Sequence, residues 1–391
     1  MSWLREDKLL LLCCRTEIGD KERNKLTEIQ INKIDWDCFL EKARQEGISP
    51  IVFLMLPRII TDKNIIPGHV TDEFKKDYYL TAKKNILTLN SLGNILDVFN
   101  KAGLKVIVLK GAALAETVYG NLALRSMSDV DLLVKKEDLY RINEQLNDLG
   151  YYPTDRSVDD VDLSSTYLTS LDYRNPLGNS PSLHIHWHFV NSTIPNESYI
   201  SQINMEDIWR DAVRTNIANT GTWVMSPHHL IIHLAEHALR VTHSLSKLSY
   251  FCDIDRSINY YGKGLDWSLL VRDTIRFNLN KMVYTTLYFS RYFIEAKIPE
   301  DVLLKLKPER FGIPEKIFMR KTAENKRTPG MSYLIHLSMN KGLVKKLKFV
   351  GRTLFPPKDI LAQRSYISGS DMNYRYYINR IRDVLTHIFK L

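Results

Sequence analysis

Cysteine is scarce in this chain, which has four cysteines in 391 residues, at positions 13, 14, 38 and 252. Cys13 and Cys14 are adjacent, and no two cysteines have the Cys-x-x-Cys spacing of a zinc or redox motif. Cysteines placed in this way make a poor disulfide framework. We therefore expect free thiols and a cytoplasmic protein.

Long hydrophobic runs are also missing. No apolar run approaches the roughly 18 residues that a membrane-spanning helix needs. The apolar run near the N-terminus, residues 9–14, is short, lies among acidic residues and precedes no small-residue cleavage site. Such a segment is not typical of a secretory signal. The sequence therefore predicts neither a membrane span nor a signal peptide.

Acidic residues are outnumbered by basic ones, because 54 Lys and Arg stand against 45 Asp and Glu and give a net charge of +9. This excess favours phosphate-rich partners through long-range attraction. The charge by itself is not a nucleic-acid footprint, and nucleic acid is not the expected partner. The apolar content of 44% and the charged content of 25% are ordinary for a globular protein.

The hydrophobic pattern divides the chain into three regions. Residues 1–100 have the three-and-four spacing of helices. Residues 226–391 return to this spacing and end in a tail, from 341 onward, with eleven Lys and Arg against three Asp. Residues 101–225 have a different texture, with short apolar segments. We expect an α/β core at 101–225, between an N-terminal and a C-terminal helical region.

Short β-branched segments between helix-like runs define the expected core. The predicted strands are 104–109, 128–134 and 182–190, and the predicted helices are 111–120 and 136–150. The polar stretch 154–181 predicts a hairpin or a loop.

Two acidic residues lie inside the second of these strands. Because side chains alternate along a strand, Asp129 and Asp131 project from one face while Val130 and Leu132 point into the core. Carboxylates about 6–7 Å apart repel each other unless a cation lies between them. Mg²⁺ suits such a pair, since it binds carboxylate oxygens and substrate phosphates together. The pair predicts a metal site, although an Asp-x-Asp pair also occurs without function in surface loops.

A strand, a glycine and a helix precede the aspartate pair in VIVLKGAALAE. The free N–H groups at the start of a helix bind anions, and Gly111 lets a phosphate approach the backbone closely. Lys110 adds a positive charge beside it. The sequence thus predicts a phosphate site next to a metal site, although a glycine at a helix start also serves packing alone.

The stretch GLKVIVLKGAALAETVYGNLALRSMSDVDLLV resembles the nucleotidyltransferase superfamily shared with polymerase beta. With the weaker segments LHIHWHF, LIIHLAEHAL, DIDRSINYYGKGLDWSLLV and RTLFPP, the chain from Trp36 onward resembles a bacterial nucleotidyltransferase group more closely. Members of that group tend to sit beside exopolysaccharide or lasso-peptide clusters. The resemblance implies an α+β fold with a polymerase-beta-like core, a short mixed sheet with helices on one side.

The resemblance also implies roles for individual residues. Gly111 matches the loop glycine of the superfamily, and Ala112 replaces its second Gly or Ser. Asp129 and Asp131 match the metal-binding acids, and Arg125 and Ser128 match positions that the close family keeps before them. With the charge of Lys110, the predicted nucleotide-binding residues are Lys110, Gly111, Ala112, Arg125 and Ser128.

One position departs from the family pattern. Where a third carboxylate is expected, two residues before His-Trp, the chain has His184. Alternation would place His184, His186 and His188 on one face. Imidazole can take a proton near neutral pH, but it suits Mn²⁺ or Zn²⁺ better than Mg²⁺. The missing acid could also be Asp172 or Glu197, or the protein could be inactive.

The function implied is transfer of a nucleoside monophosphate from an NTP, with ATP expected, to an unknown acceptor in the presence of Mg²⁺ or Mn²⁺. The acceptor would be a small molecule, a glycan precursor or a ribosomally made peptide, which would place the protein in natural product biosynthesis. The alternative is a degenerate member that acts as a binding or regulatory subunit in such a system.

The histidines and the basic tail suggest further possibilities. His233, Glu236 and His237 fit an inverted zinc-protease motif, but so short a match arises readily by chance. His237 is expected to face the active site, whereas His228 and His229 are expected to cap their helix or face solvent. The basic tail could lie on an anionic membrane, although packing of its apolar residues against the helical region is favoured.

Overall fold

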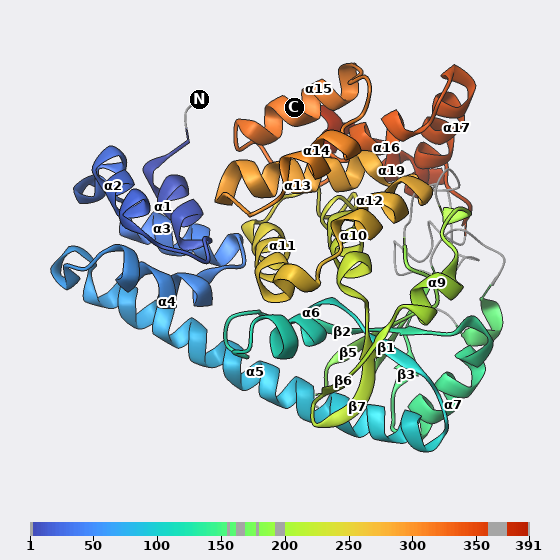
Figure 1. Ribbon diagram of the computed structural model, residues 1–391. Coiled ribbons are helices and arrows are strands. Elements are labelled where there is room, and N and C mark those ends of the chain that lie inside the picture. The colour runs from blue at the N-terminus through green and yellow to red at the C-terminus, as the bar shows by residue number, and fades with distance from the viewer. Residues whose placement is uncertain are drawn as a thin grey trace.

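The computed structural model describes residues 3–154, 157–161, 169–176, 180–191, 200–358 and 374–389. Helices come first, a sheet follows, and helices end the chain (Figure 1). The N-terminal helices are α1 (Arg5–Cys13), α2 (Asp20–Ile29), α3 (Trp36–Gln45), α4 (Ser49–Ile59) and α5 (Gly68–Lys101), with 3₁₀ turns at Ile31–Lys33 and Lys63–Ile65.

A mixed sheet of seven strands forms the core of the described part of the chain, in the order β3-β4-β5-β2-β1-β7-β6. Its strands are β1 (Val106–Val108), β2 (Asp129–Val134), β3 (Tyr152–Pro153), β4 (Ser170–Arg174), β5 (Ser182–His186), β6 (Val213–Ile217) and β7 (Thr220–Val224). The helical elements between the strands are α6 (Lys110–Ala113), a π-helical turn at Leu114–Val118, α7 (Leu139–Asp148), α9 (Met205–Arg210) and 3₁₀ turns at Lys136–Asp138 and Val158–Asp160.

The C-terminal part is helical. Its elements are α10 (Pro227–Ala238), α11 (Leu248–Tyr261), a 3₁₀ turn at Gly262–Gly264, α12 (Trp267–Arg276), α13 (Asn280–Ile294), α14 (Glu300–Leu306), α15 (Ile313–Ala323), α16 (Tyr333–Met339), α17 (Leu343–Leu354) and α19 (Tyr374–Phe389). Within the part of the chain that the structure describes, no helix combines the length and the apolar character needed to cross a membrane.

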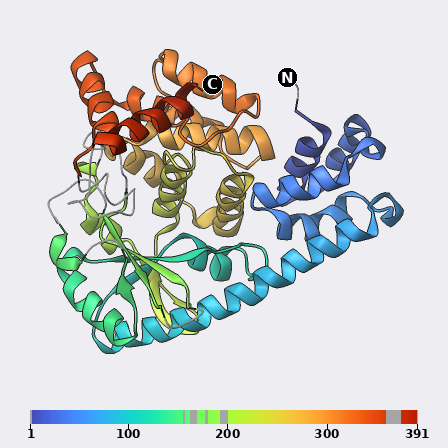
Figure 2. The same ribbon diagram turned by 180° about the vertical axis from the view of Figure 1, so that it is seen from behind.

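The long helix α5 runs from the N-terminal helices to the sheet, as both views show (Figures 1 and 2). Near its start, Val70 and Phe74 pack into the same apolar cluster as the other N-terminal helices. Near its end, Leu92 and Phe99 pack into the cluster beneath the sheet. Gly103, with φ +69°, then lets the chain reverse into β1. The same helix therefore serves two of the expected regions, whose boundaries stay predictions.

Alternate side chains of strand β2 lie on opposite faces of the sheet. Val130, Leu132 and Val134 face the apolar cluster that α5 and α7 complete. Leu133 belongs to the opposite cluster, which also contains residues of α10 and α11. The side chains of Asp129 and Asp131 alternate with the first set and therefore lie on the same side as Leu133. The sheet thus presents its acidic positions toward the C-terminal helices.

The sheet is larger than the three strands that the sequence predicts. Strand β4 lies inside the stretch 154–181, which we expected to be a hairpin or a loop. Strands β6 and β7 form a hairpin whose turn residues, Ala218 and Asn219, both have positive φ values, +53° and +60°. Such a turn usually contains Asn-Gly or Asp-Gly. Neither pair occurs at this turn, so the hairpin could not be recognised from the sequence.

The strand predicted at 182–190 is too long, because β5 ends at His186. The Val190 N–H group donates to the His188 Nδ1 atom at 3.1 Å, a local bond that replaces the pairing of an extended strand. His188 consequently leaves the face shared by His184 and His186. The prediction that all three histidines share one face is wrong for His188.

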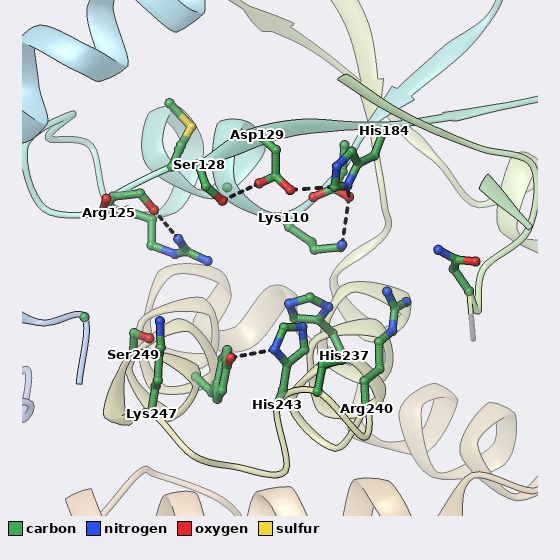
Figure 3. Close-up of a pocket in the computed structure, with 18 of the residues that line it drawn as sticks. Lys110, Arg125, Ser128, Asp129, His184, His237, Arg240, His243, Lys247 and Ser249 are labelled. Atoms are coloured by element: carbon green, nitrogen blue, oxygen red, sulfur yellow. Dashed lines mark hydrogen bonds and ion pairs between the residues drawn. The ribbon is translucent and has the colours of Figure 1, made fainter. Parts of the chain in front are cut away.

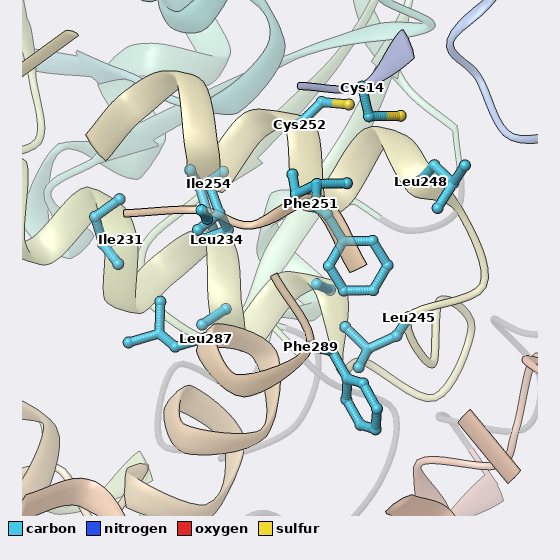
Figure 4. Packing of buried hydrophobic residues seen from close by; sticks show 14 of the residues in the cluster. Cys14, Ile231, Leu234, Leu245, Leu248, Phe251, Cys252, Ile254, Leu287 and Phe289 are labelled. Atoms are coloured by element: carbon cyan, nitrogen blue, oxygen red, sulfur yellow. The ribbon is translucent and has the colours of Figure 1, made fainter. Parts of the chain in front are cut away.

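The C-terminal helices pack around α10, α11 and α13 (Figure 4). Ile231 and Leu234 of α10 meet Phe251 of α11 and Phe289 of α13 in one buried cluster. Cys14 from the N-terminal part reaches the same cluster, and all four cysteines are free thiols, as expected.

The start of the basic tail forms the amphipathic helix α17. Phe349 is buried against the neighbouring helices, whereas Leu343, Val344 and Leu347 are 73%, 80% and 62% exposed. The expected packing of the apolar residues therefore holds for Phe349 but not for these three. Contact of this segment with an anionic membrane stays a prediction.

Candidate active site

The two aspartates of β2 line a cavity of about 570 Å³ between the sheet and the C-terminal helices. Asp129 is half-buried, with a side chain 30% exposed, and its Oδ1 atom accepts a hydrogen bond from Ser128 Oγ at 2.8 Å. Asp131 is buried. The cavity falls within the ordinary size range of small-molecule sites.

Strand β5 places two histidines beside these acids, because Asp131 and His184 are register partners in the parallel pairing of β2 and β5. His184 Nδ1 lies 3.2 Å from Asp129 Oδ2 and 3.7 Å from Asp131 Oδ1. His186 Nε2 lies 2.8 Å from Asp131 Oδ1. The imidazole of His184 therefore bridges the two carboxylates.

The protonation states of these groups follow from burial and charge. Burial alone would lower the pKa of His184, but the hydrogen bond and the charge of Asp131, with Asp172 and Asp129, raise this pKa to about 9. Burial lowers the pKa of His186 to about 4 despite Asp131. Burial would raise the pKa of Asp131, yet Lys110 and the two histidines hold it well below its usual value. At neutral pH the site thus holds a carboxylate, an imidazolium and a neutral imidazole.

Lys110 follows β1 in a strained conformation, with φ +40°. Positive φ values are uncommon for residues other than glycine, and such strain often occurs at functional sites. The buried Lys110 Nζ atom lies 2.9 Å from Asp131 Oδ1, and burial lowers the pKa of Lys110. The ammonium predicted to meet a phosphate is therefore bonded to the predicted metal ligand.

Gly111 lines the cavity, whereas Ala112 does not. A Cβ atom on Gly111 would lie 3.1 Å from the Met127 side chain, so the missing side chain makes room for Met127. The Ala112 side chain is buried in the apolar cluster under the sheet. The helix predicted over 111–120 is a single α-helical turn followed by a π-helical turn.

Arg125 lies on the cavity wall and is tied to α11. Its Nε atom donates to both oxygens of Asp253, at 2.8 and 3.1 Å, and Tyr119 Oη donates to Asp253 Oδ1 at 2.8 Å. The buried Asn85 of α5 donates to the carbonyl oxygens of Leu122 and Arg125. These bonds fix the loop that leads into β2.

The Arg125–Asp253 pair yields a stability prediction. Asp253→Asn should lower the free energy of unfolding by about 3 kcal/mol, the low end for breaking a buried ion pair, because Arg125 stays partly exposed. Urea denaturation measures this change. Asp301→Asn, which removes an exposed pair with Lys305, is the matched control and should change the free energy of unfolding by less than about 0.5 kcal/mol. Equal stability of the Asp253→Asn protein and the unmodified protein would contradict the prediction.

The wall opposite the aspartates comes from the end of α10 and from the loop after it, as Figure 3 shows. His237 lies there, in agreement with the expectation that it faces the site. His243 is next to it, with ring centroids 4.4 Å apart, and its Nδ1 atom lies 2.8 Å from Tyr250 Oη. Burial lowers the pKa of His243 to about 3, so its imidazole is neutral.

Positive charge predominates in the cavity. Five cationic side chains line it together with two aspartates, and these cations are Arg44, Lys110, Arg125, Arg240 and Lys247. Arg240 is held by Glu236 at 3.0 Å, and Arg44 by Asp77 at 2.8 Å. The Lys247 side chain is exposed, and it makes no hydrogen bond or ion pair with any residue that the structure describes. Such a surplus of fixed cations attracts polyanions such as phosphates.

The residues of the zinc-protease motif have other partners. His233 Nδ1 lies 3.1 Å from the Phe189 carbonyl oxygen, and Glu236 pairs with Arg240. His228 and His229 are buried, 5% and 0% exposed, so the expectation that they cap α10 or face solvent is wrong. They lie against Asp273 of α12 instead.

Asp172 lies close enough to His184 to be the third acid. Asp172 on β4 is the register partner of His184, and its Oδ1 atom lies 3.6 Å from His184 Nε2. His184 therefore lies between Asp172 and the aspartate pair. Glu197, the other acid considered, lies outside the described residues.

Several donors could hold a cation. Ligand atoms of Asp131, His184 and His186 lie within 4.8 Å of one another, and Asp129 Oδ2 is 3.2 Å from His184. Two carboxylates with imidazole fit a divalent ion, and the nitrogen donors favour Mn²⁺ or Zn²⁺ over Mg²⁺.

Three of the five cations that line the cavity, Arg44, Arg240 and Lys247, could not be predicted from the sequence. Arg240 and Lys247 lie more than 100 residues beyond Asp131 in the chain, and Arg44 more than 80 residues before it. A weak signal was present, because His233, His237 and Arg240 follow helical spacing. His186 was expected on the face of His184, but no role was assigned to it.

A family model described as "Uncharacterised nucleotidyltransferase" matches residues 32–295. The antibiotic-resistance factor ANT(2'')-Ia is a similar solved structure, with a TM-score of 0.33, 12% identity and coverage of 53% of this chain and 94% of its own. An antigenic nucleotidyltransferase-like protein from Paracoccidioides brasiliensis has a TM-score of 0.32, 16% identity and coverage of 55% and 96%. No curated protein matches the chain.

Proposed function

This chain belongs to the family of uncharacterised nucleotidyltransferases, and from that premise we propose that it transfers a nucleoside monophosphate from an NTP to an acceptor. The observation that supports this most strongly is one cavity in which Asp129 and Asp131 face a wall of cations. Acids suit a metal, and the cations suit a triphosphate. ATP is the proposed NTP.

The proposed reaction forms one bond and breaks another. An acceptor oxygen bonds to the α-phosphorus of the NTP, the bond from that phosphorus to the bridging oxygen breaks, and pyrophosphate leaves. A divalent ion held by Asp129 and Asp131, Mg²⁺ or Mn²⁺, would neutralise phosphate charge. Lys110 and Arg240 would bind the phosphate oxygens and hold the chain of phosphates in place.

His184 is the proposed proton acceptor or third ligand. Its imidazole contacts Asp129 on one side and Asp172 on the other, at 3.2 and 3.6 Å. A carboxylate behind an imidazole orients the ring and stabilises its protonated form. In that role His184 would first release its own proton to water and would then accept the proton of the acceptor hydroxyl. The acceptor proposed is a ribosomally made peptide, a glycan precursor or a small molecule.

The test is a reaction with each of the four NTPs, labelled at the α-phosphate, and Mg²⁺ or Mn²⁺. Pyrophosphate release is measured alongside the label, because its detection does not depend on knowing the acceptor. Candidate acceptors are the protein itself, synthetic peptides and sugar phosphates. We expect pyrophosphate release and a labelled product with at least one NTP and one acceptor.

A second candidate is a degenerate member that binds nucleotide without transferring it. The bonding of Asp131 Oδ1 favours it, because this atom already has Lys110 Nζ at 2.9 Å and His186 Nε2 at 2.8 Å. A protein that binds labelled NTP but releases no pyrophosphate with any metal or acceptor would support this candidate against the first.

A further inference from the structure

A second group of metal-ligating side chains lies away from the cavity, at the other end of α10. His228 and His229 begin that helix, Asp273 belongs to α12, and Asp211 directly follows α9. His237, which lines the cavity, comes nine residues after His228 in the same helix, about 13 Å along its axis at 1.5 Å per residue. The second group is therefore separate from the end of α10 that lines the cavity.

The ligand atoms of the second group converge. His228 Nε2 and His229 Nε2 each lie 3.4 Å from the same atom, Asp273 Oδ2. His228 Nε2 lies 3.9 Å from Asp211 Oδ2. The donor atoms of Asp211, His228 and His229 are all within 4.8 Å of one another. Asp211, His228 and His229 thus form one group of donors, and Asp273 Oδ2 lies beside the two imidazoles of that group.

The two imidazole nitrogens have no other use in the structure. Both Nε2 atoms are buried and have no hydrogen-bond partner among the residues described. Buried polar atoms in folded proteins are normally hydrogen-bonded. Two unpartnered nitrogens directed at one carboxylate oxygen are the arrangement that a shared cation requires.

Two contacts hold the His229 ring in place. Its Nδ1 atom lies 3.0 Å from Ser226 Oγ, a contact that fixes the ring and leaves the Nε2 lone pair free for a metal. Phe277 stacks on the ring and keeps this side apolar.

The acidic partner is also held in place. Arg272 bonds to both oxygens of Asp273, at 2.9 and 3.2 Å, and Arg276 bonds to Oδ1 at 3.2 Å. These arginine side chains are 57% and 43% exposed, whereas the Asp273 side chain is fully buried. Water therefore screens the arginine charges, and Oδ2 lies between the Arg272 guanidinium and the two imidazoles.

We propose that Asp211, His228, His229 and Asp273 bind a Zn²⁺ ion. Zinc bonds of about 2.0–2.2 Å in a tetrahedron separate neighbouring ligand atoms by about 3.3–3.6 Å. His228 Nε2 and His229 Nε2 each lie 3.4 Å from Asp273 Oδ2, and His228 Nε2 lies 3.9 Å from Asp211 Oδ2. An octahedral ion with similar bonds would need about 3.0 Å. Two imidazoles with two carboxylates are ligands that zinc accepts readily.

The site is structural in this proposal, because four protein ligands complete a tetrahedron and leave no position for substrate. The ion fastens the end of α9 and the helix α12 to the start of α10. It thereby stabilises the helix whose other end carries His237 and leads to Arg240. The proposal is independent of the reaction in the cavity.

The test uses the whole protein after treatment with a chelator and dialysis. Zn²⁺ is titrated in competition with a chromophoric chelator, and the melting temperature is measured with and without Zn²⁺. We expect one tightly bound Zn²⁺ per chain and a higher melting temperature with the metal. In His228→Gln/His229→Gln, the affinity should fall by more than about 100-fold, and the rise in melting temperature should disappear.

Two further variants keep the test decisive. His184→Gln/His186→Gln alters the other cation-binding group and should leave the tight Zn²⁺ in place. Asp211→Asn changes the more exposed ligand, with a side chain 25% exposed, so the protein should fold, and its affinity should fall about tenfold or more. Tight binding that survives when either His228→Gln/His229→Gln or Asp211→Asn is combined with His184→Gln/His186→Gln, or no tight Zn²⁺ in the unmodified protein, would overturn the proposal.

Discussion

Replacing Asp129 and Asp131 together by asparagine should reduce nucleotide transfer by at least about 10³-fold. Asparagine keeps the shape of the side chains but removes both negative charges, and a divalent ion then loses its two anionic ligands. Pyrophosphate release from the preferred NTP is the measurement. Asp148→Asn, an exposed acid at the end of α7, is the matched control and should keep full activity.

The two positions should differ in their effect on folding. Asp131 neutralises the buried Lys110, so Asp131→Asn leaves an ammonium without its partner and should lower stability. Asp129 is half-buried, and Asp129→Asn should fold like the unmodified protein. The single Asp129→Asn variant therefore separates chemistry from folding. Full transfer activity in a folded Asp129→Asn/Asp131→Asn protein would remove the proposed mechanism.

Lys110→Met should lower kcat/KM for the NTP by about 10²–10³-fold. In the structure the ammonium bonds to Asp131 at 2.9 Å, and the proposed function requires it to bind a phosphate oxygen when the nucleotide is present. Methionine has a similar length and flexibility but no charge. Lys101→Met, at the exposed end of α5, is the matched control and should leave kcat/KM unchanged.

Lys110 could instead serve only to balance the charge of Asp131. In that case Lys110→Met would lower the melting temperature but leave kcat/KM at the level of the Lys101→Met protein, which would contradict the phosphate role. Measuring the apparent affinity for inorganic triphosphate in the same variants separates the two effects, because only the phosphate role predicts weaker binding.

The acidic half of the site could be predicted from the sequence because its spacing is local. A strand alternates its side chains, so Asp129 and Asp131 share a face, and Val130 and Leu132 fill the core on the other side. The resemblance placed Gly111 and His184 nearby. The periodicities indicated strands between helices, and the resemblance implied a short mixed sheet with helices on one side. The structure has a mixed sheet of seven strands with helices packed on both faces.

The cationic half depended on long-range packing that no local pattern encodes. Arg44 belongs to α3, whereas Arg240 and Lys247 belong to the loop between α10 and α11, and these side chains meet at the cavity only in the folded chain. The bond of Lys110 to Asp131 depends on a positive φ value that a lysine rarely adopts. The hairpin of β6 and β7 was missed because its turn lacks glycine at the central positions.

The buried histidines show the same limit. His228 and His229 begin a helix, where polar residues usually cap or meet water. The structure buries them because α12 packs across the start of α10 and brings Asp273 to their Nε2 atoms. Only tertiary contact distinguishes a ligand from a surface histidine at such a position.

The most direct measurement of the central claim is a crystal structure with Mn²⁺ and a non-hydrolysable NTP, in which anomalous scattering locates the metal. The account predicts a metal bonded to Asp129 and Asp131 at about 2.1 Å, with Lys110 moved from Asp131 to a phosphate oxygen. A nucleotide bound with its phosphates away from both aspartates, and Asp131 still bonded to Lys110 and His186, would contradict it.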